Sequence, residues 1–416
     1  MDSKRLLLLG TDPYAGYRRT EAMTLSGNEI TDTMRAAGVQ GDGVLAPDNS
    51  VGIWPTATNL CTNGGFETNT TGWAVGGANT IARSADVAKF GSYSAKATYQ
   101  DNAMLASFGV TLTAAIHSAS CWLYVPTAFD GTSVTVGFVG FVGATGTLTA
   151  NADLAIRDRW QRVTVKTVTI VAGDLAGSID VTCGGAPTAS RYVYIDGFQI
   201  ETGSIATPYV ETNGGTATRT AARVRVPTGN LGQTPTSGWV ATRFNMPYAS
   251  GHNNWGTGNW DRLFAWRQDV NSLIEVKHHI ADPGRHSAIC QRVTGGTAEV
   301  KEGALKTFVA NSDHLIVGQW DATTVQVSTN GEAFESGASV SAPATLPSTA
   351  DVGSIAGTSA WARRNLYWQA YGPGTLTNAQ AAILHAMGNR PDYHALRAMG
   401  CAGVWDCREP RTLRYL

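Results

Sequence analysis

Short runs in which apolar and polar residues alternate recur along most of this chain. One run, 119–125, is centred on Trp122, and another, 162–171, changes phase between Val165 and Val168. A period of two residues is that of a strand with one buried face, and a change of phase within a run is typical of a β-bulge. Because Gly- and Thr-rich segments separate the runs, the pattern predicts an all-β chain with antiparallel sheets packed as sandwiches.

Composition divides these runs into two consecutive sandwiches. The first, a jelly roll, is expected over 59–213, where Gly-rich turns join short strands. A Gly/Thr-rich linker follows, and the second sandwich is expected over 214–372, which holds most of the tryptophans. Within it, Asn330 and Gly331 come directly after an alternating run, and this dipeptide is typical of a tight hairpin turn.

The two ends of the chain lack this pattern. Residues 1–58 show no sustained periodicity, which predicts an extended N-terminal anchoring arm, ordered by a partner or by packing on the first sandwich; a flexible leader is the alternative. Residues 373–416 are expected to form one short helix and then an Arg-rich segment, either a docking tail or a solvated end. The helix should begin at the capping box of Thr377 and Gln380 and end at Gly388.

Charge and hydropathy narrow the class of protein. Among 416 residues, 31 are Lys or Arg and 32 are Asp or Glu, which gives a formal net charge of -1. A surface for nucleic acid needs clustered cations, so no nucleic-acid partner is expected. The apolar run Leu6–Leu9 is too short for the core of a signal peptide or for a membrane span, which predicts a protein made in a cytoplasm, without membrane insertion.

The stretch 59–73 carries the most specific motif, N-L-C-T-N-G-G-F-E-T-N-T-T-G-W. Its glycine pair predicts a tight bend, at which Asn63 tolerates left-handed geometry. Phe66 and Trp73 are large apolar groups and are expected to be buried anchors. Glu67 lies between them and needs water, a hydrogen-bond donor or a cation.

This opening stretch resembles the start of the jelly rolls that serve as carbohydrate-binding modules in xylanases and cellulases. The segment 192–210, Y-V-Y-I-D-G-F-Q-I-E-T-G-S-I-A-T-P-Y-V, matches the end of such a domain and resembles the form found in phage virion and tail proteins. In that family a Glu of the opening motif and an Asp of the closing strand help to hold a structural calcium, so the resemblance implies Glu67 and Asp196 as calcium ligands. The alternative is two surface or hydrogen-bonded carboxylates, and no other cofactor is expected.

The second sandwich has its own resemblance and its own candidate surface. The run 314–331 resembles the laminin-G and concanavalin-like lectin domains. The loop 252–261, H-N-N-W-G-T-G-N-W-D, lacks strand periodicity and places tryptophans beside amide side chains, the groups that stack on sugar rings and bind their hydroxyls. The expected carbohydrate-binding residues are Trp255, Trp260, Asn253, Asn254 and Asn259. These tryptophans could instead cover the core or contact another subunit.

Motifs for catalysis are missing from the sequence. It has no H-E-x-x-H, G-x-S-x-G or Walker loop, and Glu275 is not followed by the alternating acids of a lectin-fold glycosidase, so no enzyme is expected. His278 and His279 are neighbours on an expected strand and should point to opposite faces, which argues against one zinc site. Cys401 and Cys407 could be bridged or free.

These features together predict a bacteriophage virion structural protein: a minor tail, tail-fibre or capsid-surface component that displays its sandwiches for adhesion to host-surface glycans. Its expected partners are other virion proteins and host glycan, and the symmetry of particles favours a homo-oligomer, a trimer first. The first alternative is a secreted or cell-surface bacterial carbohydrate-binding protein. The second is a polysaccharide depolymerase.

Overall fold

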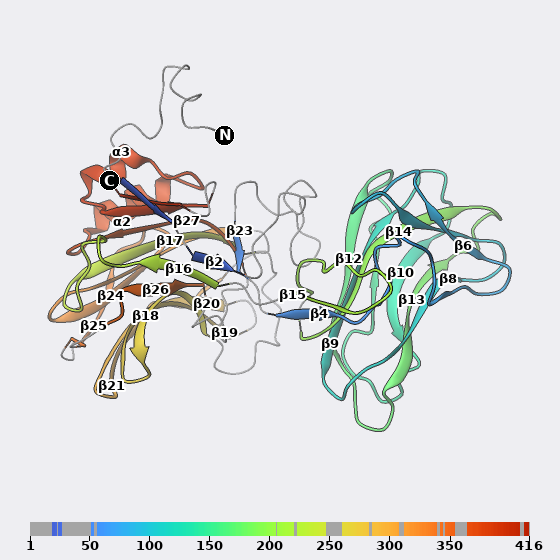
Figure 1. Cartoon of the computed structure of the whole chain (residues 1–416), viewed down its shortest axis with the longest axis horizontal. Coiled ribbons are helices and arrows are strands. Elements are labelled where there is room, and N and C mark those ends of the chain that lie inside the picture. The colour runs from blue at the N-terminus through green and yellow to red at the C-terminus, as the bar shows by residue number, and fades with distance from the viewer. Residues whose placement is uncertain are drawn as a thin grey trace, which may run out of the picture.

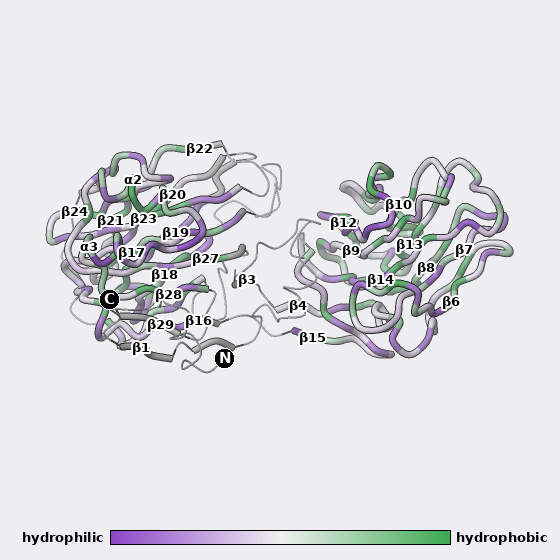
Figure 2. The backbone as a smooth tube through the Cα atoms, turned by 90° about the horizontal axis from the view of Figure 1, so that it is seen from above, coloured by the Kyte–Doolittle hydropathy of each residue, from purple (hydrophilic) through white to green (hydrophobic). Residues whose placement is uncertain are grey.

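The structure is a computed structural model that describes residues 19–22, 24–26, 51–53, 56–204, 206–219, 223–246, 260–282, 285–307, 312–338, 342–343, 346–353, 364–407 and 412–415. Within these ranges the regular structure is almost entirely antiparallel β-sheet, with two short helices near the C-terminal end. Figure 1 shows two β-rich bodies, and in Figure 2 hydrophilic and hydrophobic positions alternate along their strands. The predicted all-β class with two sandwiches is therefore confirmed.

The first sandwich has two five-stranded antiparallel sheets in the described part of the chain. One contains, in spatial order, β11 (Thr149–Asn151), β10 (Ser133–Val139), β13 (Ala176–Gly184), β8 (Met104–Thr111) and β5 (Trp73–Ala74). The other contains β12 (Trp160–Thr169), β9 (Ile116–Tyr124), β14 (Tyr192–Thr202), β7 (Ser94–Thr98) and β6 (Thr80–Ser84). The register of β12 on β9 shifts between Val165 and Val168, which confirms the bulge predicted from the change of phase.

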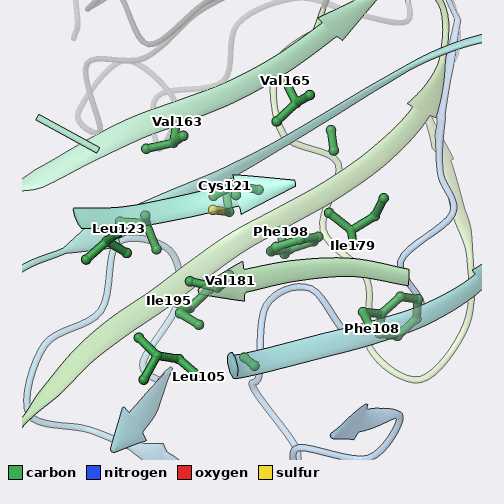
Figure 3. Close-up of a cluster of buried hydrophobic side chains, with 14 of the residues drawn as sticks. Leu105, Phe108, Cys121, Leu123, Val163, Val165, Ile179, Val181, Ile195 and Phe198 are labelled. Atoms are coloured by element: carbon green, nitrogen blue, oxygen red, sulfur yellow. The ribbon is translucent and has the colours of Figure 1, made fainter. Parts of the chain in front are cut away.

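The core of the first sandwich lies between these sheets because alternate residues of each strand point inward. Figure 3 labels part of it: Leu105, Phe108, Cys121, Leu123, Val163, Val165, Ile179, Val181, Ile195 and Phe198. Each of these side chains is buried. On β9, β12 and β14 the residues between these core positions must therefore face outward.

Gly64 of the opening stretch is needed for a close approach to β14. A Cβ on Gly64 would lie 2.0 Å from the carbonyl oxygen of Phe198, and the Phe198 N–H donates to the Gly64 oxygen at 2.9 Å. The non-glycine residue of the stretch that adopts left-handed geometry is Phe66, with φ 55°. Phe66 is fully buried, as expected, and its ring centroid lies 5.1 Å from that of Trp73.

The chain enters and leaves the first sandwich through a two-stranded sheet of β4 (Ala57–Asn59) and β15 (Ala217–Arg219). The A-T-P-Y segment lies beside this exit. Its Thr207 backbone N–H donates to Glu201 Oε1 at 2.7 Å, and Arg219 Nη2 donates to Thr207 Oγ1 at 2.9 Å. In this structure the motif ties the closing strand to the departing chain.

The second sandwich is built from two larger antiparallel sheets. The nine-stranded sheet contains β1 (Arg19–Ala22), β29 (Thr412–Tyr415), β28 (Gly403–Asp406), β27 (Arg364–Gly372), β17 (Gly238–Met246), β23 (Ser312–Trp320), β24 (Thr324–Thr329) and β25 (Glu335–Ala338), with β3 (Val51–Ile53) also on β27. The eight-stranded sheet contains β2 (Thr24–Ser26), β16 (Arg223–Pro227), β26 (Thr349–Val352), β18 (Trp260–Asp269), β19 (Ser272–Asp282), β20 (Arg285–Thr294) and β21 (Thr297–Glu302), with β22 (Lys306–Thr307) on β20. Between β24 and β25, Asn330 and Gly331 have φ 52° and 77°, which confirms the hairpin turn.

Three short strands of the N-terminal region belong to the second sandwich. β1 pairs with β29, β2 with β16 and β3 with β27, and Figure 1 shows the blue β1 among the red C-terminal elements. These pairings correct, for these segments, the expectation that 1–58 forms an extended arm on the first sandwich. Because the second sandwich contains strands from both before and after the first, the first sandwich is an insertion between β3 and β16. Strands of three or four residues are too short to show a period, and their partners are distant in the chain.

The segment after the helix also belongs to a sheet. β28 and β29 extend the nine-stranded sheet beyond β27, and Val404 and Trp405 are fully buried. This corrects the expectation of a docking tail or a solvated end over 389–416 for the described part of that range. The arginines of this segment dominate its composition, whereas its few apolar residues decide where it packs.

The predicted helix is present as α2 (Asn378–Ala386). The Thr377 side chain accepts from the Gln380 backbone N–H, and the Gln380 side chain accepts from the Thr377 N–H at 2.8 Å, so the capping box is confirmed. Leu384 packs on the outer face of the nine-stranded sheet. A second helix, α3 (Tyr393–Ala398), was not predicted. Neither of these helices has the length and apolarity needed to cross a membrane, and no other helix occurs in the described ranges.

Candidate functional site

A row of side chains crosses the outer face of the β12-β9-β14-β7-β6 sheet. Trp160 of β12 pairs with Tyr124 of β9, and Tyr124 pairs with Tyr194 of β14. Tyr194 in turn pairs with Lys96 of β7. Adjacent strands lie about 5 Å apart, so this row spans about 15 Å across the strands. The residues next to these positions face the core, namely Leu123, Val193, Ile195, Ala95 and Ala97.

Edge-to-face contacts fix the rings of the aromatic row, which we define as Trp160, Tyr124, Tyr194 and Tyr192. The ring centroids are 5.7 Å apart for Tyr124 and Trp160, 5.8 Å for Tyr124 and Tyr194, and 5.3 Å for Tyr192 and Tyr194. Tyr194 is 5% exposed, whereas the other three side chains are half-buried. The row therefore offers three partly exposed rings arranged around a buried fourth.

A cation and a carboxylate close one end of the row. Lys96 Nζ lies 4.0 Å from the ring centroid of Tyr192 and 3.5 Å from Asp86 Oδ2, and Tyr194 Oη donates to the same oxygen at 2.8 Å. The hydrogen bond from Tyr194 lowers the pKa of Asp86, while burial and this carboxylate raise the pKa of Tyr194. Asp86 is therefore ionised at neutral pH and remains exposed beside a lysine.

This combination of groups matches the chemistry of a sugar ring. The C–H faces of a sugar pack on aromatic rings, and its hydroxyl groups need donors and acceptors close by. Lys96 supplies donors and Asp86 supplies acceptors at the edge of the row. The arrangement can hold a neutral saccharide laid across the strands, because the rings follow one another in that direction.

Sequence reasoning missed the aromatic row. Trp122 and Tyr124 lie on the same face of β9, yet Trp122 is only 1% exposed because Phe90 and Lys89 cover it, the lysine Nζ at 4.3 Å from the ring. The alternation Y-V-Y at 192–194 was a signal for outward-facing rings, but the register between strands was needed to align them with Trp160.

The expected calcium pair, Glu67 and Asp196, faces the loop that joins β6 to β7. Asp196 Oδ2 accepts from the backbone N–H groups of Lys89 at 2.7 Å and Phe90 at 2.9 Å. Glu67 Oε1 accepts from the backbone N–H of Ser92 at 3.0 Å. Two carboxylates far apart in the sequence therefore hold the same short loop.

The charge balance around Asp196 suits a bound cation. Its side chain is fully buried, and burial raises the pKa of the carboxyl to about 7, with the negative charge of Glu67 acting in the same direction. Asp196 Oδ2 accepts two N–H groups, so the lone pair left for a metal is on Oδ1, which accepts only the Gly197 N–H at 2.6 Å. Across the described ranges no group of three or more His, Cys, Asp or Glu could hold a metal ion. The pair thus fits a calcium ion only as part of a ligand set that carbonyl groups or water would complete.

The tryptophan loop expected to bind sugar falls mostly outside the described chain. Trp255, Asn253, Asn254 and Asn259 lie outside the described residues. Trp260 begins β18, but its side chain is outside the described part as well. The assignment of these residues to carbohydrate stays a prediction.

The adjacent histidines and the cysteines have structural environments. His278 is fully buried between the sheets, whereas His279 lies on the opposite face with Nδ1 2.7 Å from Glu302 Oε1, as the strand geometry predicts. All six cysteines are buried free thiols, so Cys401 and Cys407 are not bridged in this structure.

Comparison with known proteins finds no matching family model and no matching curated protein. Among solved structures, a family 61 carbohydrate-binding module in complex with β-1,4-galactotriose is similar at 17% identity and TM-score 0.28, over 35% of this chain and 99% of that one. The xylan-binding CBM22-1 domain of Xyn10C from Paenibacillus barcinonensis matches at 14% identity and TM-score 0.27, over 36% and 94%. Domains LG4-5 of the mouse laminin α1 chain match at 11% identity and TM-score 0.27, over 68% and 90%.

Proposed function

We propose that this chain is a carbohydrate-binding protein whose first sandwich holds a neutral saccharide along the aromatic row. The observation that supports it is the alignment of Trp160, Tyr124 and Tyr192 as partly exposed rings on one sheet face, ended by Lys96 and Asp86. Rings fixed on strands by their neighbours lose little freedom when a ligand binds. The row is therefore organised for binding before a saccharide arrives.

Replacing Trp160 with alanine is expected to weaken saccharide binding about five- to tenfold, because a stacked ring contributes about 1–1.5 kcal/mol. The measurement is depletion of the full chain from solution by immobilised host cell-wall glycan, β-1,4-galactan and xylan. The matched control is Val139→Ala, a side chain 46% exposed on the other sheet of the same sandwich, which should bind like wild type. Equal depletion of wild type and Trp160→Ala on every glycan that binds would refute the role of the row.

We also propose that the protein is a bacteriophage virion component that presents this face to host glycans, as a tail or capsid-surface protein in homo-oligomeric form. Support comes from the resemblance of the A-T-P-Y segment to phage virion proteins and from the insertion of the first sandwich into the second. β1 and β29 lie side by side in the second sandwich, while β4 and β15 carry the first sandwich as a separate module. Such an arrangement suits a base that joins other virion proteins and a module that reaches the host.

Purified virions of the phage that encodes this chain are expected to contain it after sedimentation through a density gradient and a high-salt wash. The measurement is immunoblotting of gradient fractions together with immunogold labelling of intact particles. Recovery of the chain in the envelope of uninfected bacteria, and its absence from particles, would favour a cell-surface carbohydrate-binding protein instead. Glycan binding by the aromatic row would then still stand.

A further inference from the structure

The loop 85–93, which joins β6 to β7, takes part in two sites. Its Asp86 is the carboxylate that ends the aromatic row, and Tyr194 Oη donates to Asp86 Oδ2 at 2.8 Å. The other half of the loop contacts Glu67 and Asp196, the two carboxylates expected to hold calcium. A change at either site can therefore reach the other through a few residues of one loop.

The carboxylates of Glu67 and Asp196 hold the second half of the loop by its backbone. Asp196 Oδ2 accepts two N–H groups, at 2.7 and 2.9 Å, and Glu67 Oε1 accepts two more at 3.0 Å each. The four donors are the N–H groups of Lys89, Phe90, Ser92 and Tyr93. Hydrogen bonds to an ionised acceptor are stronger than those between neutral groups. The two carboxylates therefore determine the path of this half of the loop.

Gly91 shows how closely the loop follows the Glu67 carboxylate. This residue has φ 60°, and a Cβ added to it would lie 2.4 Å from Glu67 Oε1 and 2.9 Å from Oε2. Any side chain at this position must push the carboxylate away from the N–H groups that it accepts. The loop keeps its path only with glycine at position 91 and with Glu67 beside it.

Two short links connect this half of the loop to Asp86. Only two residues separate Asp86 from Lys89 in the chain. Across the loop, Ser94 Oγ donates to the carbonyl oxygen of Val87 at 2.6 Å. The Asp86 side chain is 59% exposed, and its ion pair with Lys96 is an exposed contact of the kind that contributes little. The place of Asp86 beside the aromatic row therefore depends on the path of the loop.

We propose that Glu67 and Asp196 are positioning residues for saccharide binding, because the loop that they hold places Asp86 at the end of the aromatic row. This inference rests on the proposed function, since it concerns the same saccharide at the same site. Asp196 is fully buried, so it acts through the loop and not by contact with the ligand. Coupling between two sites is reciprocal, and a saccharide bound to Asp86 must therefore restrain the loop in turn.

Replacing Gly91 with alanine is expected to weaken saccharide binding about three- to tenfold, because Asp86 moves away from the sugar hydroxyl that it accepts. The measurement is a binding isotherm from depletion of the full chain by immobilised host cell-wall glycan, β-1,4-galactan and xylan. The matched control is Gly295→Ala. That glycine has a similar φ of 56°, but a Cβ on it would meet nothing within 4 Å, so the variant should bind like wild type.

A double-mutant cycle separates positioning of Asp86 from a general loss of structure. Asp86→Ala alone should weaken binding about tenfold, and adding Gly91→Ala to it should change the affinity further by less than about twofold. The reason is that the loop has no carboxylate left to position in that background. A merely structural effect of Gly91→Ala would instead weaken binding equally in both backgrounds.

Amide hydrogen exchange of wild type tests the same coupling without a variant, and it decides the matter if Gly91→Ala does not fold. Saturation with a soluble form of the glycan that binds should slow exchange in the segment 85–93. Wild-type affinity in folded Gly91→Ala, an equal loss in Gly295→Ala, an undiminished effect in the Asp86→Ala background, or unchanged exchange in 85–93 would each overturn the proposal. The aromatic row would still stand if Trp160→Ala binds more weakly, whereas a wild type that binds none of the glycans would remove both proposals.

Discussion

Replacing Gly64 with alanine is expected to destabilise the first sandwich by about 3–5 kcal/mol. The added Cβ would lie 2.0 Å from the carbonyl oxygen of Phe198, a backbone atom of β14 that cannot rotate away. To relieve this contact the opening stretch must separate from β14. That movement breaks the Phe198 N–H bond to the Gly64 oxygen and the Gly64 N–H bond to Thr212 Oγ1, both 2.9 Å long.

This loss is a large part of the 5–15 kcal/mol that stabilises a typical domain. The measurement is urea unfolding followed by tryptophan fluorescence, with limited proteolysis to show which sandwich opens. Gly109→Ala is the matched control, since a Cβ on this exposed β8 glycine would meet nothing within 4 Å. It should change stability by less than about 1 kcal/mol. A Gly64→Ala protein as stable as Gly109→Ala would contradict the close approach.

Local patterns in the sequence predicted those parts of the fold that are decided by nearby residues. The bulge in β12, the turn at Asn330 and Gly331, and the capping box of α2 each depend on a few consecutive side chains. Phe66 was expected to be buried, and it is. What the sequence did not reveal at this point was the geometry: Gly64 serves contact with β14, and Phe66 itself adopts the left-handed φ.

Parts of the fold that depend on distant partners could not be predicted in this way. β1 has four residues and pairs with β29 at the other end of the chain, where Arg19 lies opposite Tyr415. No period can be measured in so short a segment, and nothing in its composition identifies the partner. The region therefore suggested an extended anchoring arm, and the insertion of one sandwich into the other was missed.

The aromatic row illustrates the same limit for the candidate site. Trp160, Tyr124 and Tyr194 come from three strands, and each alone is an ordinary strand aromatic. They form a surface because the registers of β12, β9 and β14 place them opposite one another. A shift of one residue in any of these registers would move a ring to the core face. Sequence alone directed attention to tryptophans in a loop, where no register is required.

We propose that Glu67 and Asp196 bind a structural calcium ion, and the pH dependence of stability gives the test. Burial raises the pKa of Asp196 to about 7 in the folded chain, from an ordinary value of 3.8. Between these values the folded state binds the proton more tightly than the unfolded state. Stability contributed by Asp196 therefore falls as pH rises from about 4 to about 7, by on the order of 4 kcal/mol without a cation. Calcium bound to the ionised carboxylate should remove this loss.

The difference in unfolding free energy between wild type and Asp196→Asn isolates this effect, because carboxyl groups elsewhere titrate equally in both proteins. In EGTA, raising the pH from about 4 to about 7 should lower the stability of wild type relative to Asp196→Asn. In about 5 mM calcium, the difference in stability between the two proteins should be nearly independent of pH. Glu67→Gln keeps an oxygen for the Ser92 N–H but removes one anionic ligand, so its Tm should respond little to calcium. A wild-type Tm at pH 7 that is the same in EGTA and in calcium would exclude the ion. A free-energy difference that stays constant from pH 4 to 7 in EGTA would show that Asp196 does not titrate in this range. The three hydrogen bonds that Asp196 accepts from backbone N–H groups would then lower its pKa by more than burial raises it.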